Sequence, residues 1–359
     1  MKIKKKMLFF IQALLHADPK MIYVQGWHGH NNLGDEAIYS AMQKLFKGIN
    51  FVDFAKGTEC KLAARKISQI NRAILGAGTT IGYKLSNIRN LKYCFDMCSK
   101  TLVFGAGVTE LNGWKEKIDE SSREERKKLW KMLLEKCVYV GVRGPLSVSA
   151  LSERGTSNAE VIGDPVICLA DDVPPAKMTG NKTLGVNLTL QKEMWGDVKE
   201  ISEKIISFVK LVRKRTWNIL WFVVNPRDLL ATEKIARQTQ TAQNIFKLYR
   251  DYRKFKEIVK SCDVFVGTRL HSVVLAVSSY TPSVMFDYKP KCHDFMASID
   301  QERFVVRTDK INVPELYELI ECMSINRQSY VDELAVKIMQ MKKRQIDKAE
   351  ELKDLILKP

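Results

Sequence analysis

Residues 263–295 read DVFVGTRLHSVVLAVSSYTPSVMFDYKPKCHDF and carry the clearest structural pattern in the chain. A short apolar run, Val264–Val266, is typical of a buried strand. An apolar segment of helical length follows at Ser272–Ser279, and a second short apolar run comes at Ser283–Phe286. The order strand, helix, strand predicts a βαβ unit in which the two strands are parallel.

Polar and cationic side chains follow both of these predicted strands. Thr268, Arg269 and His271 come after the first, and Lys289 and Lys291 come after the second. Because parallel strands end at the same edge of their sheet, we expect these side chains to converge where such folds bind ligands. Guanidinium and ammonium groups suit an anion, and an imidazole suits proton transfer near neutral pH. The sequence therefore predicts an active site at this edge, with Thr268 in contact with substrate.

The same alternation of strands and helices extends along the chain. In the first half, strands are predicted at 21–26, 51–54, 73–80, 101–108 and 160–169, helices at 35–46, 61–69, 91–98 and 122–136, and a strand, turn and helix over 137–151. In the second half, strands are predicted at 183–188 and 218–224, and helices at 195–212, 228–239, 252–261, 315–323 and 330–357. The last of these has an apolar stripe and is expected to pack as an amphipathic helix.

A chain of 359 residues exceeds what one hydrophobic core usually supports, so we expect two large domains. The predicted units are an amphipathic segment 1–20, an α/β domain 21–172, a Pro/Gly-containing linker 173–182, a second α/β domain 183–310 and C-terminal helices 311–359. We therefore predict an α/β fold of two doubly wound, Rossmann-like domains that face a cleft, an arrangement described as GT-B-like.

The turn after the first predicted strand holds further candidate residues. Asn32, Gly34 and Asp35 lie there, next to His28 and His30. Glycine permits a tight backbone, Asn and Asp can cap the following helix, and such a turn presents N–H groups to an anion. The same residues would also make an ordinary capped turn, although the two histidines favour contact with a substrate. Neither G-x-G-x-x-G nor a Walker pattern is present, so the sequence does not support nucleotide binding by those devices.

Two glycines and one arginine complete the candidate set. Gly78 and Gly107 lie at the ends of predicted strands, where bare backbone lets a ligand approach closely, and simple packing is the alternative. Arg143 follows another strand, in the position that Arg269 has in the second half. A surface salt bridge is the common role of such an arginine, but its position also fits contact with an anion.

The formal net charge is +17, with the excess spread over both halves of the chain. It favours acidic substrates, phosphates or an anionic membrane surface as partners, although solvated lysine accounts for most of it. Zinc-finger spacing, an aromatic RNA-binding signature and a dense basic recognition helix are all absent, so no nucleic-acid partner is predicted. The eight cysteines show no complete metal-site spacing, which predicts buried free thiols in a reducing cytoplasm and no metal.

The lysine-rich start of the chain superficially resembles a signal peptide. Its apolar run, Met7–Leu15, is too short to span a bilayer, and His16–Lys20 lacks a cleavage site with small residues. We expect a short amphipathic helix that docks on the protein or rests on the inner leaflet. The predicted localisation is cytoplasmic, with peripheral contact at the inner face of an anionic membrane as the alternative.

Six segments, taken in order, resemble one protein family. They are Asn31–Glu36, Gly105–Gly107, Val142–Ser147, Ile162–Pro165, Val266–His271 and Phe286–Lys289. Together they resemble the polysaccharide pyruvyltransferase family over roughly residues 22–295, and the Gly-Thr-Arg-Leu-His segment is the most specific. The first twenty and the last sixty residues carry no motif of that family.

This resemblance implies a GT-B fold and an enzyme that moves the enolpyruvyl unit of phosphoenolpyruvate onto a sugar of a surface-polysaccharide precursor, forming a pyruvate ketal and releasing phosphate. By position, Arg143 and Arg269 would hold the carboxylate and phosphate of the donor, and His271 would be the general acid/base. Lys289 would assist at the phosphate. Phosphoenolpyruvate would be a co-substrate, with no further cofactor and no metal.

The chemistry of these residues agrees with the implied reaction. Bidentate arginine contacts suit a small, multiply anionic donor. An imidazole can protonate the methylene carbon and recover a proton from the attacking hydroxyl. The turn with Asn32 and Asp35 would then contact the acceptor, which would be lipid-linked or an oligosaccharide.

Two other functions remain open on the sequence alone. A GT-B glycosyltransferase that uses a nucleotide sugar would need a residue to hold the ribose, and the helix after Val266 offers no obvious acidic one. A non-enzymatic basic module on a membrane or glycan would explain the charge. It would not explain why Arg143, Arg269 and His271 fall at strand ends.

Overall fold

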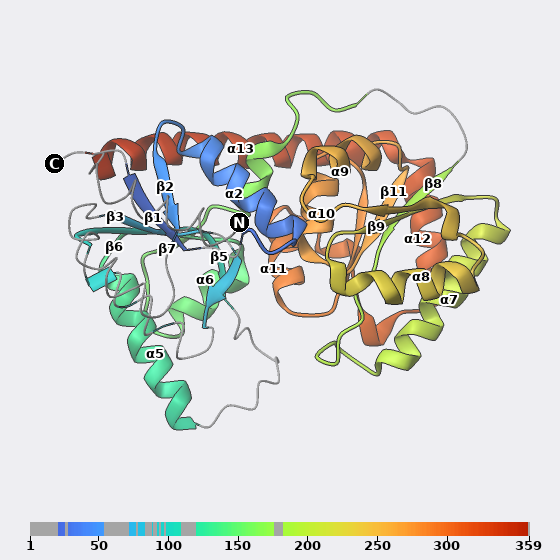
Figure 1. Ribbon diagram of the computed structural model, residues 1–359, viewed down its shortest axis with the longest axis horizontal. Coiled ribbons are helices and arrows are strands. Elements are labelled where there is room, and N and C mark those ends of the chain that lie inside the picture. The colour runs from blue at the N-terminus through green and yellow to red at the C-terminus, as the bar shows by residue number, and fades with distance from the viewer. Residues whose placement is uncertain are drawn as a thin grey trace, which may run out of the picture.

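The computed structural model describes residues 21–25, 28–53, 72–76, 78–82, 88, 92, 95–96, 98–108, 120–175 and 182–357. Within these ranges the chain forms two parallel sheets, each surrounded by helices (Figure 1). The α/β fold class predicted from the sequence is confirmed. The predicted segment 1–20 and the predicted helix 61–69 lie outside the described residues. None of the described helices has the length and hydropathy needed to cross a membrane.

The first sheet is built from the N-terminal half of the chain. Its described strands are β1 (Met21–Gln25), β2 (Asn50–Asp53), β3 (Arg72–Leu75), β4 (Gly78–Ile81), β5 (Lys100–Val108), β6 (Cys137–Val142) and β7 (Ala159–Val161). They lie in the order β2-β1-β3-β5-β6-β7, β4 pairs with β5, and every pair is parallel. The helices of this half whose bounds are described are α2 (Leu33–Leu45), α5 (Glu120–Glu135) and α6 (Pro145–Ser152).

The second sheet has the strand order of a dinucleotide-binding fold. Its strands are β8 (Thr183–Asn187), β9 (Asn218–Val223), β10 (Ile245–Lys247), β11 (Val264–Gly267), β12 (Ser283–Asp287) and β13 (Val305–Arg307). The spatial order β10-β9-β8-β11-β12-β13 reverses direction between β8 and β11, which creates a crevice at their carboxyl ends. The helices are α7 (Val198–Lys214), α8 (Leu229–Gln238), α9 (Tyr252–Val259), α10 (Leu270–Val277) and α11 (Lys291–Ser298).

Two predicted strands of the first half differ from the structure. The predicted strand 73–80 is divided into β3 and β4, which both pair with β5. The predicted strand 160–169 is wrong beyond β7, because Pro165–Leu169 form a 3₁₀ helix, η1. Gly163 has a φ of +85°, and Pro165 has no N–H to continue a strand ladder. All five residues of η1 are buried, so their apolar pattern reflects burial rather than strand geometry.

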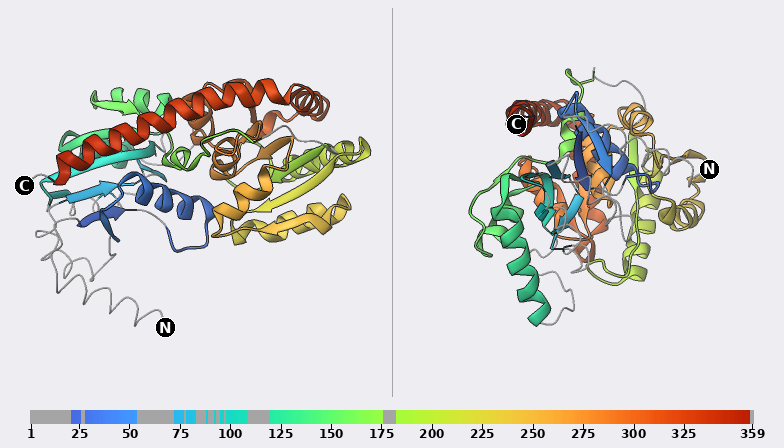
Figure 2. Two further views of the ribbon diagram at one scale, coloured as in Figure 1. Left: turned by 90° about the horizontal axis from the view of Figure 1, so that it is seen from above. Right: turned by 60° about the vertical axis from the view of Figure 1, so that its left-hand side comes forward.

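The C-terminal helices connect the two halves. After α12 (Val313–Ile325), helix α13 (Arg327–Leu357) runs along both sheets (Figures 1 and 2). Gln345 Nε2 donates hydrogen bonds to the carbonyl oxygens of Ile162 at 3.0 Å and Asp164 at 2.9 Å. Near the end of the helix, Arg72 Nε donates to the carbonyl of Ile356 at 2.6 Å. The amphipathic packing predicted for this helix is present, and α13 packs on the first domain as well as the second.

A carboxylate of the second domain caps a helix of the first. Helix α6 begins after Gly144, which has no side chain to accept the free N–H groups of the first turn. Asp294 of α11 supplies the acceptor, taking hydrogen bonds from Ser147 N at 3.1 Å and Ser147 Oγ at 2.6 Å. Asp294 is fully buried. Because α11 belongs to the second domain and α6 to the first, this cap is also a contact between the domains.

We expect Asp294→Ala to destabilise the fold by about 2 kcal/mol, since it removes a helix cap and leaves the buried Ser147 hydroxyl without its acceptor. The matched control is Asp197→Ala, because Asp197 caps α7 from an exposed position within one domain, at 2.9 and 3.0 Å. This change should cost only about 1 kcal/mol. Urea titration of both variants checks the difference, and equal losses would contradict an additional contribution from the domain contact.

Candidate active site

The first turns of α2 and α10 meet at the interface of the two domains. Helix α2 begins at Leu33, two residues earlier than predicted. The backbone N–H of Leu33 donates a hydrogen bond to the carbonyl oxygen of Val224, which follows β9, at 3.0 Å. Gly34 lies directly against His271, because a Cβ at Gly34 would clash with Nδ1 and Cγ of that ring. The imidazole predicted to be catalytic is therefore held against a glycine predicted to contact substrate.

Gly34→Ala should displace this imidazole and lower kcat by roughly 10- to 100-fold, because small misplacements of a reacting group are costly. Because the imidazole of His271 can move aside, the unfolding temperature should fall only slightly, although kcat falls strongly. Gly48→Ala is the control, because Gly48 has a φ of +87° with nothing within 4 Å of an added Cβ. The control should lose some stability and retain kcat. Equal kcat values for the two variants would contradict the positioning of His271 by Gly34.

Asp164 joins His271 to Arg143. Arg143 Nε donates to Asp164 Oδ2 at 2.9 Å, and His271 Nε2 lies 3.3 Å from the same oxygen, close enough for an ion pair but without the geometry of a hydrogen bond. The other carboxylate oxygen accepts from Val166 N at 3.1 Å. Complete burial by itself raises the pKa of Asp164, but the charges of His271 and Arg143 and the hydrogen bonds outweigh it, so the pKa lies below its ordinary value. The site thus contains an ionised carboxylate between two of the predicted catalytic residues.

Arg143 is completely buried at the carboxyl end of β6. Its Nη1 donates to Thr79 Oγ1 at 3.2 Å, whereas its buried Nη2 has no hydrogen-bond partner among the described residues. A Cβ at Gly107 would lie 2.7 Å from Nη1, so Gly107 makes room for the guanidinium. Gly78 has a φ of +121° and immediately precedes Thr79. The two predicted glycines therefore shape the surroundings of Arg143.

Arg269 lies at the reversal point of the second sheet. Its Nε and Nη2 form a bidentate pair with Asp228, both at 2.8 Å. Although burial alone lowers the pKa of Arg269, Asp228 raises it above its ordinary value. Thr268 is buried, and its hydroxyl accepts from Thr189 N at 2.6 Å. Thr268 therefore braces the loops at this edge, and the side chain of Arg269 retains 18% exposure.

The lysine predicted to assist the phosphate is paired at the surface. Lys289 Nζ lies 2.6 Å from Glu193. Lys291 lies 5.2 Å from the ring centroid of Tyr288, and its charge acts on Asp35. Burial raises the pKa of Asp35 above its ordinary value, although His271 and Lys291 oppose the shift. Lys291 thus faces the cluster around His271.

Asn32 is the residue before the first turn of α2, but its side chain makes no capping hydrogen bond, so the predicted cap is absent there. Asn32 Nδ2 donates to Asp35 Oδ2 at 2.5 Å. Asp35 interacts electrostatically with both His271 and Arg269. Arg143 therefore contacts the cluster through Asp164, whereas the link of Arg269 to the cluster is electrostatic, through Asp35. Sequence reasoning did not assign roles to Asp164 and Asp228, although Asp164 lies in the motif Ile162–Pro165.

A buried carboxyl at the same sheet edge titrates near neutral pH. Burial raises the pKa of Asp287 from 3.8 to about 7, and Arg307 opposes the shift only in part. Its Oδ1 has no hydrogen-bond partner in the part of the chain that the structure describes. Between these values the folded protein retains a proton that the unfolded chain has lost. The contribution of Asp287 to stability is therefore fully present below pH 4 and is lost as the pH rises through 7.

Asp287→Asn should remove up to about 4 kcal/mol of this pH dependence, since the carboxyl that ionises is gone. The measurement is the free energy of unfolding between pH 4 and pH 8, where the variant should give a flatter curve than the wild type. Asp96→Asn is the control, because Lys136, 2.7 Å away, contributes to lowering the pKa of Asp96, and Asp96 is not among the groups that shift the pKa of Asp287. This control should alter the acid limb of the curve instead. An unchanged slope between pH 4 and 7 in Asp287→Asn would contradict the assignment.

Among the described residues, no group of three or more His, Cys, Asp or Glu side chains is arranged to hold a metal ion. The charged groups of the site include cationic side chains of the kind that bind anions and an imidazole of the kind that transfers protons. Two arginines, one lysine and an imidazole come from both domains, and three carboxylates orient or neutralise them.

Comparison with known proteins relates this site to one family. The family model described as "Polysaccharide pyruvyl transferase" matches residues 32–290. The matched range begins at Asn32 and ends at Pro290, so it includes Arg143, Asp164, His271 and Lys289. General stress protein 30 of Bacillus subtilis is 22% identical over 324 residues, which cover 86% of this chain and 87% of that protein.

Solved structures resemble the chain in fold. A glycosyltransferase from Rickettsia africae has a TM-score of 0.58 and 10% identity, covering 94% of this chain and 99% of its own. A UDP-GlcNAc 2-epimerase from Methanocaldococcus jannaschii has a TM-score of 0.52 and 12% identity, covering 84% and 91%. At these identities the likeness concerns the fold alone, and it confirms the predicted GT-B-like arrangement of two Rossmann-like domains.

Proposed function

Because the chain belongs to the polysaccharide pyruvyl transferase family, we propose that it uses phosphoenolpyruvate to place a pyruvate ketal on a sugar of a surface-polysaccharide precursor. The observation that carries this proposal is the completely buried guanidinium of Arg143, whose Nη2 has no hydrogen-bond partner among the described residues. A buried charged donor without an acceptor is costly. A small anionic donor bound there would supply the missing acceptor.

Each of the other charged side chains of the site has a separate role around such a donor. Arg143 binds one anionic group, and Arg269, held by Asp228, presents its exposed edge to another. Lys291 takes over the supporting role expected of Lys289, because Lys289 is occupied by Glu193. Asp35 accepts a hydrogen bond from an acceptor hydroxyl at the start of α2.

The proposed reaction requires two additions at C2 of the donor. His271 gives a proton to the methylene carbon, which becomes the methyl group, and one sugar hydroxyl attacks the oxocarbenium-like C2. The proton of that hydroxyl returns to His271. A second hydroxyl then replaces the phosphate at C2, and its proton leaves with the phosphate. Asp164 holds His271 in orientation through both steps, as carboxylates commonly do for catalytic imidazoles.

The acceptor that we propose is a lipid-linked sugar or an oligosaccharide, with phosphoenolpyruvate as the only co-substrate. We place the reaction in the cytoplasm, because the described cysteines are free thiols and are nearly all buried. Peripheral contact with an anionic membrane would bring the enzyme to a lipid-linked acceptor.

Phosphate release from phosphoenolpyruvate, measured across a panel of sugar acceptors, tests the proposal. Release should depend on both donor and acceptor, and the product should carry the pyruvate unit by mass spectrometry. Thermal-shift titration should show stabilisation by phosphoenolpyruvate and not by UDP-sugars. Stabilisation by a UDP-sugar alone, together with transfer of that sugar, would instead identify a glycosyltransferase.

A further inference from the structure

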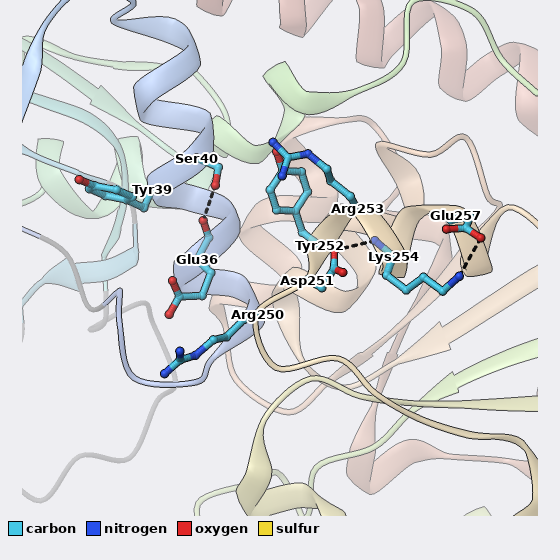
Figure 3. Close-up of a pocket in the computed structure, with 9 residues that line it drawn as sticks. All are labelled: Glu36, Tyr39, Ser40, Arg250, Asp251, Tyr252, Arg253, Lys254 and Glu257. Carbon is cyan, nitrogen blue, oxygen red and sulfur yellow. Dashed lines mark hydrogen bonds and ion pairs between the residues drawn. The ribbon is translucent and has the colours of Figure 1, made fainter. Parts of the chain in front are cut away.

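A cavity lies beside the catalytic cluster (His271, Asp35, Asp164 and Arg143) and is not explained by the donor chemistry. It has a volume of about 520 Å³ and opens between α2 and the start of α9 (Figure 3). Glu36 and Ser40 line it from α2, and Arg250 and Arg253 line it from the second domain. The cavity is therefore formed by both domains, as the catalytic cluster is.

The cationic side chains of this cavity differ in how they are engaged. Lys254 pairs with Glu257 at 2.8 Å. Arg250 Nε donates a hydrogen bond to the side-chain oxygen of Asn31. Arg253 lies 5.0 Å from the ring centroid of Tyr252 and has no ion pair among the described residues. Two guanidinium groups thus have terminal donors available to an anion, and a guanidinium is the side chain best suited to bind phosphate.

Hydroxyl-binding groups line the cavity together with these arginines. Glu36 Oε1 accepts from Gly29 N at 2.7 Å, which leaves the second carboxylate oxygen available. Ser40 Oγ donates to the carbonyl of Glu36 at 3.0 Å and can still accept a hydrogen bond. In Figure 3 the Glu36 carboxylate is on the same side of the opening as Arg250. A carboxylate and a hydroxyl beside two guanidiniums suit a ligand that has both sugar hydroxyls and a phosphate.

The cavity and the catalytic cluster share one turn of backbone. Gly34 packs on His271 and Asp35 interacts with His271, whereas Glu36 lines the cavity. Successive helix residues are separated by about 1.5 Å along the axis and point in different directions. Arg250 also holds Asn31, which has a φ of +58° at the approach to this turn. A ligand in the cavity would therefore border the position where a sugar hydroxyl must meet the donor.

We propose that this cavity binds the phosphorylated part of the acceptor, a sugar phosphate or sugar diphosphate. Arg250 and Arg253 bind its phosphate groups, and Glu36 accepts a sugar hydroxyl. The acceptor then reaches past the first turn of α2 to His271. This inference rests on the proposed function, because it names the acceptor class for the same reaction centre.

The direct test is isothermal titration with inorganic pyrophosphate and with glucose 1-phosphate as probes. The variant is Arg250→Gln with Arg253→Gln, and the control is Arg237→Gln, an arginine on α8 whose side chain is 75% exposed. In the double variant, the affinity of one set of binding sites for these probes should fall by about tenfold or more. The control should retain all sites. Equal site numbers and affinities in the wild type and the double variant would overturn the proposal.

A vesicle assay identifies the source of the phosphate. Phosphatidylcholine vesicles with and without a polyprenyl phosphate are sedimented with each protein. Binding that requires the polyprenyl phosphate and is lost in the double variant supports a lipid-linked acceptor. Binding of glucose 1-phosphate without vesicle binding supports a soluble phosphosugar. Vesicle binding that persists in the double variant, together with unchanged probe binding, contradicts both forms of the proposal.

Steady-state kinetics separates this inference from the proposed function. In the double variant, KM for a phosphorylated acceptor should rise about tenfold or more, whereas KM for phosphoenolpyruvate should not change. If phosphoenolpyruvate is not the donor, no acceptor will give phosphate release, yet the loss of probe binding will remain. If the cavity is not the acceptor site, phosphate release will proceed with an unchanged acceptor KM.

Discussion

His271→Ala is expected to lower kcat for phosphate release by about 10²- to 10⁴-fold, the range that removal of a general acid/base usually costs. His271 lies 3.3 Å from an ionised carboxylate and contacts the first turn of α2, so no neighbouring side chain can take its position without rearrangement. The change should leave KM for phosphoenolpyruvate within a few-fold, because the contacts that we propose for the donor come mainly from the arginines. Steady-state kinetics on the purified variant gives both values.

Chemical rescue provides the control for this result. The deleted ring leaves a space beside Gly34, and added imidazole should restore part of the activity of His271→Ala. The restored rate should increase with imidazole concentration and should follow the ionisation of imidazole. A variant that folds normally and retains near-normal turnover without imidazole would refute the role of His271 as the proton donor.

The second large effect is expected from Asp164→Ala. It leaves the guanidinium of Arg143 buried without its carboxylate, and breaking such a buried pair costs about 3–5 kcal/mol. It also removes the group that orients His271, so kcat should fall together with stability. Urea unfolding measures the first effect, and phosphate release from the fraction that remains folded measures the second.

A double variant distinguishes the ion pair from general disruption of the core. Arg143→Met removes the guanidinium that Asp164→Ala leaves unpaired, so the two changes together should be less destabilising than the sum of the single changes. Activity should not return, since the proposed donor contact is also absent. If the double variant lost as much stability as that sum, the ion pair itself would contribute nothing to the free energy of unfolding.

Local sequence pattern was enough to predict the alternation of strands and helices in both halves. Strands β8, β9, β11 and β12 lie within a residue of their predicted bounds, because buried parallel strands are short apolar runs between turn residues. The same rule failed at residues 165–169. A buried 3₁₀ helix and a buried strand have the same apolar composition, and only the geometry at Gly163 separates them.

The candidate site was predictable to a smaller extent. His271 and Arg143 could be proposed because strand ends meet at one edge of a sheet, and the structure joins them through Asp164. Nothing local distinguished Lys291 from Lys289, since both follow β12. The pairing of Lys289 with Glu193 in the folded chain is the reason why our proposal favours Lys291.

By itself the sequence determined the fold class, the family and the strand ends that carry the charged residues, because these depend on periodicity and short motifs. Tertiary structure alone decided that Asp164 bridges Arg143 and His271, that Asp294 caps α6 across the domain interface, and that α13 packs on both halves. Each of these contacts joins residues far apart in the chain. Their partners are selected by burial and by the need of buried polar groups for hydrogen bonds, which local pattern does not record.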